Sequence, residues 1–173
     1  SVIAGGSSEA DASVIKVACV GDSITWGNGS SSGKSYPAQL RELLGSAFEV
    51  KNFGVSGRTL LKKGDYPYWN ESSYTESKEY LPDVVIIMLG TNDSKSQNWA
   101  YKSEYKSDYI DLINQYKSLA SNPKVYVATS PMALDNTMNI RKDVIANEIV
   151  PLQKEIAEET GCKLIDINAY TQG

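Results

Sequence analysis

The feature that most restricts the fold of this sequence is the run 84–89, which reads Val-Val-Ile-Ile-Met-Leu. A strand with one solvent-exposed face alternates apolar and polar residues, whereas this run is apolar on both faces. Such a run is typical of a central parallel strand with helices packed on both sides of its sheet. It is the longest apolar run in the chain, and a membrane helix needs about 20 such residues. We therefore expect no membrane span.

Segments rich in β-forming residues alternate with segments whose apolar residues recur every three or four positions. A helix is predicted at 36–44, with Gly45 as its stop signal. A second helix follows the third strand, and its spacing predicts that Tyr105, Tyr109 and Tyr116 face the core. Five strands are predicted, at 14–20, 48–53, 84–89, 125–129 and 164–167.

A further helix is predicted between the fourth and fifth strands. Its apolar residues include Ile145, Ile149 and Ile156. Pro151 is expected to kink or split this helix, and Gly161 to cap it.

This order of elements predicts a three-layer α/β/α domain with a mainly parallel, five-stranded sheet. The domain is expected to cover residues 13–173, and residues 1–12 are expected to be a linker or a mature N-terminal segment. Six residues follow the last strand, so the domain is expected to lack its final helix. Ligands of such sheets bind at the carboxyl ends of the strands.

Composition excludes some classes of protein. The chain has 17 Lys and Arg against 21 Asp and Glu, a net charge of −4, which argues against nucleic-acid binding. Cys19 and Cys162 are expected to be unpaired thiols rather than a disulfide. No cofactor and no metal ion is expected. The Gly/Ser/Ala-rich start favours a secreted or periplasmic location over a cytoplasmic one.

Three short motifs follow the first three predicted strands. They are Gly-Asp-Ser-Ile-Thr at 21–25, Asn-Phe-Gly-Val-Ser-Gly-Arg-Thr at 52–59 and Gly-Thr-Asn-Asp at 90–93. Taken singly, each has an ordinary structural explanation. Ser23 is then a helix N-cap, the glycine-rich segment a strand-to-loop turn, and Asn92 a turn or cap residue.

Taken together, the motifs indicate acyl-transfer chemistry. All three lie at the carboxyl ends of strands, where ligands bind. Ser23 would attack a carbonyl carbon, and a glycine N–H and the Asn92 amide would stabilise the oxygen on which negative charge builds up. Each such donor contributes about 3–4 kcal/mol in comparable sites. Both Gly57 and Gly54 are candidates for the glycine.

The three motifs, in this order and spacing, resemble blocks I, II and III of the SGNH (GDSL) hydrolase superfamily. The resemblance spans about residues 14–173 and implies a flavodoxin-like sheet of order 2-1-3-4-5. It implies that Ser23 is the nucleophile and that the oxyanion hole is formed by the N–H of Ser23, the N–H of Gly57 and the side chain of Asn92. The Val-Ser-Gly alignment favours Gly57 over Gly54.

A finer resemblance is to bacterial sialate O-acetylesterase-like carbohydrate esterases. It implies removal of short acyl groups, with acetyl as the expected group, from a carbohydrate through an acyl-enzyme on Ser23. The substrate would be a small-molecule or glycan ester. The alternatives are a lysophospholipase or thioesterase of the same superfamily, or a non-catalytic binding module on this scaffold. The stretches that carry the resemblance are 17–25, 36–40, 52–54, 89–95 and 98–99.

The family's last block, an Asp-x-x-His followed by Pro, is missing, and the sequence contains no histidine. In relatives this block comes shortly after the fifth strand. We therefore expect it beyond residue 173 and expect little activity from these residues alone. Alternatively, the chain is a non-catalytic relative, or another residue replaces the histidine. Lys95 and Asp166 are the residues considered as substitutes, although a solvated lysine and a turn aspartate are the preferred interpretations.

Aromatic residues near the motifs suggest contacts with a sugar. Trp26 and Trp99 are candidates for the walls of the cleft, with packing against the core as an equal alternative for each. The polar, aromatic segment 62–80 is predicted to be a lid or substrate loop, and a plain covering of the core is the alternative.

Overall fold

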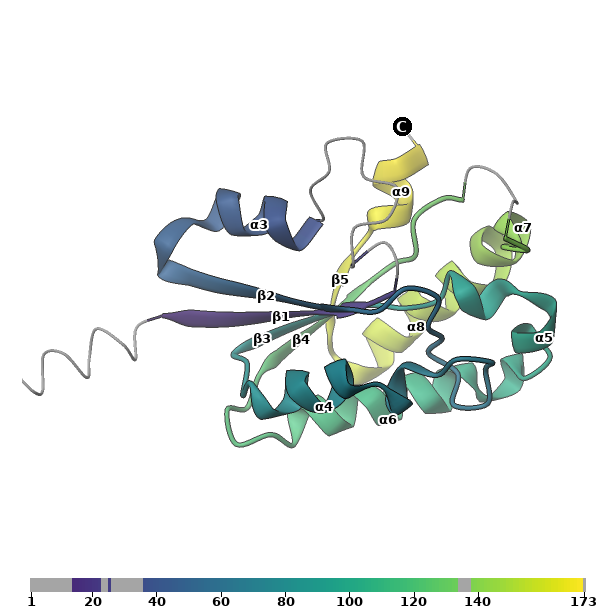
Figure 1. The fold of residues 1–173 in the computed structure, drawn as a ribbon. Coiled ribbons are helices and arrows are strands. Elements are labelled where there is room, and N and C mark those ends of the chain that lie inside the picture. The colour runs from purple at the N-terminus through teal and green to yellow at the C-terminus, as the bar shows by residue number, and fades with distance from the viewer. Residues whose placement is uncertain (1–13, 23–24, 26–35, 134–137, 173) are drawn as a thin grey trace, which may run out of the picture.

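The computed structural model describes residues 14–22, 25, 36–133 and 138–172 of the chain (Figure 1). Its sheet has five parallel strands in the order β2-β1-β3-β4-β5, so the predicted order is confirmed. The apolar run forms β3, which lies between β1 and β4 and is buried along most of its length. The strands are β1 (Ile15–Gly21), β2 (Phe48–Gly54), β3 (Val84–Met88), β4 (Lys124–Ala128) and β5 (Lys163–Ile165).

Helices cover both faces of the sheet (Figure 1). One face packs against α4 (Ser72–Glu79), α6 (Tyr105–Lys117) and α8 (Val150–Thr160), and the other lies beneath α3 (Tyr36–Leu44) and α9 (Ile167–Gln172). The short helices α5 (Ser96–Trp99) and α7 (Lys142–Val144) lie near the carboxyl ends of the strands. Within the described residues, no helix has the length and apolar character needed to cross a bilayer.

Helix α6 contributes three tyrosines to the core, as its spacing predicted. Tyr105, Tyr109 and Tyr116 are each 0% exposed. Two of the buried hydroxyls have close partners: Tyr105 Oη donates to the Leu89 carbonyl at 2.8 Å, and Tyr116 Oη shares a hydrogen bond with Ser77 Oγ at 2.7 Å. Burial of a polar atom without a partner costs about 1–3 kcal/mol, so these bonds let the rings remain inside.

Both cysteines are free, as predicted. Gly161 caps the C-terminus of α8, also as predicted. The expected disturbance near Pro151 takes the form of a π-helical turn over Ile145–Ile149. Helix α8 begins immediately after this turn and has Pro151 in its first turn, where the missing N–H is tolerated.

Two segments differ from what the sequence predicted. Helix α9 follows β5 directly, although no helix was expected there. Asp166 precedes it, and its Oδ1 accepts hydrogen bonds from the Ala169 N–H at 3.1 Å and from Thr129 Oγ1 at 2.9 Å. These bonds, led by the one from Ala169, lower the pKa of the Asp166 carboxyl. Asp166 therefore has a structural role at the start of a helix, where a turn residue was the preferred interpretation.

The second is the segment 62–80, predicted as a lid or substrate loop with a covering of the core as the alternative. It contains α4 and a 3₁₀ turn over Tyr68–Asn70. Tyr68 is fully buried and donates from its hydroxyl to the Phe53 carbonyl at 2.6 Å, while Tyr74 packs edge-on against Tyr116. Most of this segment is therefore a covering of the core.

Candidate active site

The three motifs start at neighbouring positions on one edge of the sheet. Gly21, the last residue of β1, pairs with Gly54 of β2 on one side and with Met88 of β3 on the other. The contact continues past the ladder, since the Val55 N–H donates to the Gly21 carbonyl at 3.0 Å. The register of the sheet thus brings together the starts of three loops that are far apart in the sequence.

Ser23 lies outside the described residues, and so does Trp26. The described neighbours Gly21 and Thr25 contact the sheet. A Cβ atom on Gly21 would lie 2.0 Å from Thr25 Oγ1 and 2.7 Å from the Met88 carbonyl oxygen, so only glycine fits there. Asn52 Nδ2 donates to the Thr25 carbonyl at 2.9 Å, which ties the segment to β2.

The structure distinguishes the two candidate glycines of the second motif. The Gly54 N–H donates to Asn52 Oδ1 at 2.8 Å and is therefore already used. Gly57 lies beyond the strand and has φ +78°, a left-handed conformation that a residue with a Cβ adopts only at a cost. Among the described residues, no acceptor is paired with the Gly57 N–H. These observations favour Gly57 as a backbone donor.

Asn92 lies beside the same loop. It begins a 3₁₀ turn over Asn92–Ser94 shortly after β3 and is 5% exposed. Its Nδ2 donates to the Arg58 carbonyl at 3.1 Å, which places the side-chain amide next to the residue that follows Gly57. An amide group has two N–H donors, so one remains for a ligand.

Asp93 joins the two loops, a role that was not assigned to it from the sequence. Its Oδ1 accepts the Leu60 N–H at 3.0 Å, and its Oδ2 accepts the Leu61 N–H at 2.8 Å. Burial raises the pKa of this fully buried carboxyl to about 7, against the opposing effect of its backbone hydrogen bonds. One signal for this role was present: an acidic residue next to Asn92 at the end of a buried strand needs buried partners.

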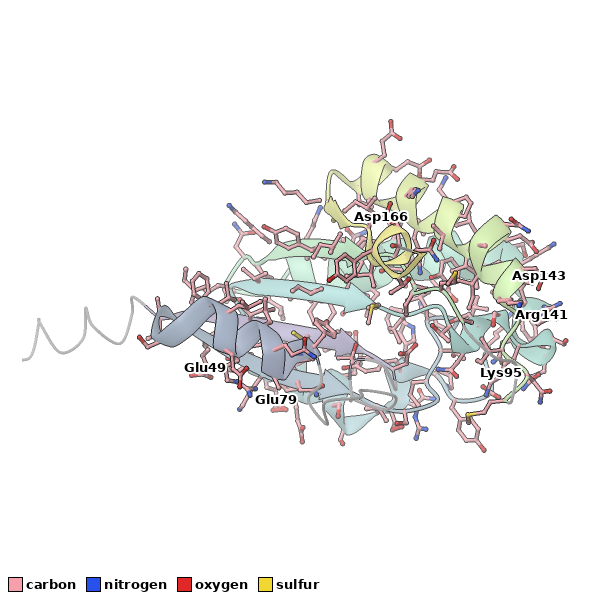
Figure 2. The ribbon with its side chains drawn as sticks, turned by 90° about the horizontal axis from the view of Figure 1, so that it is seen from above. Glu49, Glu79, Lys95, Arg141, Asp143 and Asp166 are labelled. Carbon is pink, nitrogen blue, oxygen red and sulfur yellow. The ribbon has the colours of Figure 1, made fainter. Side chains whose placement is uncertain are left out.

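Other contacts hold the third motif in place. Asn98 Nδ2 donates to the Asn92 carbonyl at 2.8 Å. Arg141 Nε donates to the Ser94 carbonyl at 2.6 Å, and its N–H donates to Ser94 Oγ at 3.0 Å. Figure 2 places Lys95 close to Arg141 at this end of the molecule and well away from Asp166, so the two residues considered as substitutes for histidine do not form a pair.

Trp99 packs against the core. It is 4% exposed, lies edge-on to Tyr105 and donates from Nε1 to Glu148 Oε1 at 3.1 Å. Of its two interpretations, packing rather than a cleft wall is therefore correct. No cluster of three or more side chains suited to a metal ion occurs in the part of the chain that the structure describes.

Comparison with known proteins identifies the relatives of this arrangement. Residues 19–173 match the GDSL-like Lipase/Acylhydrolase family. An acetylxylan esterase of Xylanibacter ruminicola is 41% identical over 174 residues, which cover 90% of this chain and 36% of that protein. The chain thus spans about a third of the length of this curated relative.

Solved structures share the fold. The inhibitor-bound aryl esterase of M. smegmatis superposes with a TM-score of 0.73 at 22% identity, over 88% of this chain and 84% of that one. A carbohydrate acetylesterase family member from Sinorhizobium meliloti gives a TM-score of 0.70 at 22% identity, over 88% and 83% of the two chains. These likenesses confirm the predicted α/β architecture.

Proposed function

We propose that this chain, which belongs to the GDSL-like lipase/acylhydrolase family, carries the nucleophile and the oxyanion hole of an esterase that removes acetyl groups from a carbohydrate. The observation that supports this most is the hydrogen bond from the Asn92 amide to the Arg58 carbonyl at 3.1 Å. It sets a side-chain donor beside the loop of Gly57 at the carboxyl edge of the sheet. The acetylxylan esterase that is 41% identical over most of this chain supports the choice of substrate.

In the proposed reaction, Ser23 Oγ attacks the carbonyl carbon of the ester. The carbonyl oxygen gains negative charge and accepts hydrogen bonds from the Gly57 N–H, the free N–H of the Asn92 amide and the Ser23 N–H. The sugar hydroxyl leaves, and an acetyl group remains on Ser23. Water then attacks this acetyl ester, and acetate is released.

The reaction needs a base that takes the proton of Ser23 and an acid that returns it to the leaving sugar. The 173 residues contain no histidine. We propose that an Asp-x-x-His block of the family supplies this group in the full-length protein. Asp166 is not proposed for this role, because its carboxylate is engaged at the start of α9.

The test uses the full-length protein and p-nitrophenyl acetate. Ser23→Ala is expected to abolish turnover, whereas Ser118→Ala, at the far end of α6, is expected to leave it unchanged. Equal turnover by wild type and Ser23→Ala would exclude Ser23 as the nucleophile. Octanoyl esters cleaved faster than acetyl esters would instead favour a lysophospholipase or thioesterase, and a wild type inactive on both would favour a binding module.

A further inference from the structure

A hollow of about 260 Å³ is lined in part by Arg58, the neighbour of the proposed donor Gly57. Arg58 follows Gly57 in the chain, and its carbonyl accepts the hydrogen bond from Asn92. The hollow therefore shares Arg58 with the loop that carries the proposed donors. Its lining consists of Arg58, Asp65, Tyr66, Pro67, Asn70 and Glu71.

The walls of the hollow are held by internal contacts. The Thr59 N–H donates to the Tyr66 carbonyl and the Tyr68 N–H to the Thr59 carbonyl, both at 2.9 Å. Asn98 pairs with Asp65, accepting its N–H at 2.8 Å and donating to its Oδ1 at 3.1 Å. Because Asn98 also bonds to Asn92, the hollow and the oxyanion loop share one framework. A ligand would meet a site that is already formed.

The exposed side chains of the hollow combine an aromatic ring with polar groups. Tyr66 is 60% exposed, so much of its side chain is open to a ligand. The Arg58 guanidinium carbon lies 5.3 Å from the centre of the Tyr66 ring, and Arg58 Nε forms an ion pair with Glu71 Oε1. Glu71 retains a second carboxylate oxygen, and Asn70 contributes an amide with donors and an acceptor.

This chemistry matches a sugar. A sugar ring presents C–H groups on its face, which pack on an aromatic ring, and hydroxyls at its edge, which bond to carboxylates and amides. The lining carries two carboxylates and one guanidinium, so its formal charge disfavours an anionic ligand. An acyl chain would need an apolar lining. The volume is also below the roughly 300–1,000 Å³ of pockets for drug-sized ligands, which suits a single sugar ring.

We propose that this hollow is a glycan subsite, and that it binds the sugar ring adjoining the one that carries the ester, with Tyr66 as its stacking platform. The inference rests on the proposed function and adds the means by which the enzyme would select a polymeric glycan over a small ester. Asn70 and Glu71 bind hydroxyls of this ring, while Asp65 and Arg58 hold the walls.

The experiment compares two substrates in the full-length protein: acetylated xylo-oligosaccharide, which is long enough to fill the subsite, and p-nitrophenyl acetate, which is not. Tyr66→Ala is expected to lower kcat/KM for the oligosaccharide about tenfold, through KM, and to leave p-nitrophenyl acetate unchanged. Tyr66→Trp is expected to retain activity on both. Tyr101→Ala is the matched control, since Tyr101 is also exposed (40%) and has Lys63 over its ring, but lies outside the hollow.

An equal loss on both substrates, or a loss on neither, would overturn the subsite, because the ring would then support the loop or do nothing. A second measurement does not depend on hydrolysis. Binding of xylohexaose without acetyl groups is measured by calorimetry with wild type and Tyr66→Ala. Binding that weakens about tenfold in the variant supports the subsite even if no esterase activity is found, and undetectable binding to wild type contradicts it.

Discussion

Replacing Asp93 with asparagine tests how burial and hydrogen bonding compete at the carboxylate that joins the two motif loops. Burial raises the pKa of Asp93 from 3.8 to about 7 in the folded protein. The folded state therefore holds this proton more tightly than the unfolded state does. The protonated Asp93 carboxyl contributes its full stabilisation of the fold below about pH 4. That stabilisation is lost as the pH rises through about 7.

The size of the effect follows from the two pKa values. Linkage removes at most about 3 kcal/mol of wild-type stability between about pH 5 and about pH 8. Asparagine does not titrate, so Asp93→Asn lacks this dependence. Near pH 5 the substitution is expected to cost about 1–3 kcal/mol, because one amide oxygen must serve two buried N–H donors. The cost should shrink toward pH 8.

Urea unfolding, followed by tryptophan fluorescence at both pH values, measures this difference. Asp108→Asn is the comparison, because the Asp108 carboxylate accepts one backbone N–H, that of Lys62, at 3.0 Å. Lys62 directly follows Leu61, whose N–H is bound by Asp93. If the cost of Asp93→Asn grew with pH, the ionised carboxylate would be the favoured form. Hydrogen bonding would then outweigh burial, and the reasoning would be refuted.

Two further substitutions probe the proposed oxyanion donors. Gly57→Ala places a Cβ on a residue with φ +78°, so it should destabilise the loop by about 1–2 kcal/mol and lower kcat. Gly161→Ala, at φ +71° on the cap of α8, should carry the same strain and leave kcat unchanged. Equal kcat values for the two variants would remove Gly57 from the site. Asn92→Ala should reduce kcat on p-nitrophenyl acetate about 10²–10³-fold with little change in KM. A loss confined to KM would make Asn92 a binding residue instead.

The fold was predictable because its signals are local and repeated. The run at β3 is apolar on both faces, which predicted a central strand with helices on both sides. The spacing of Tyr105, Tyr109 and Tyr116 predicted a buried helix face. Helix α9 carried no such signal, because six residues are too few to show a period. It depends on the Asp166 contacts with Thr129 and Ala169, and the first of these joins residues 37 positions apart.

The candidate site was predictable in part. The strand ends brought Gly57 and Asn92 into the same region, because parallel strands finish on one edge of a sheet. The position of Asp93 after a buried strand predicts that it needs buried partners, but not which ones. Those partners are backbone N–H groups 32 and 33 residues away, and a backbone donor leaves no mark in a sequence. For the segment 62–80 the sequence left a covering of the core as the alternative to a lid, because its core residues, Tyr68 and Tyr74, also carry hydroxyls that suggest an exposed loop.

In the segment from Tyr66 to Glu71, two anchored residues lie between residues that line the hollow. Tyr68 is bound to the Phe53 carbonyl and Trp69 donates from Nε1 to the Leu60 carbonyl at 2.9 Å, whereas Tyr66 and Asn70 on either side face the hollow. The presented side chains can therefore be exchanged while the anchors keep the backbone in place. With the proposed glycan subsite, substrate preference and reaction chemistry become separable properties, and positions 66 and 70 are the natural choice for a library that tests this separation.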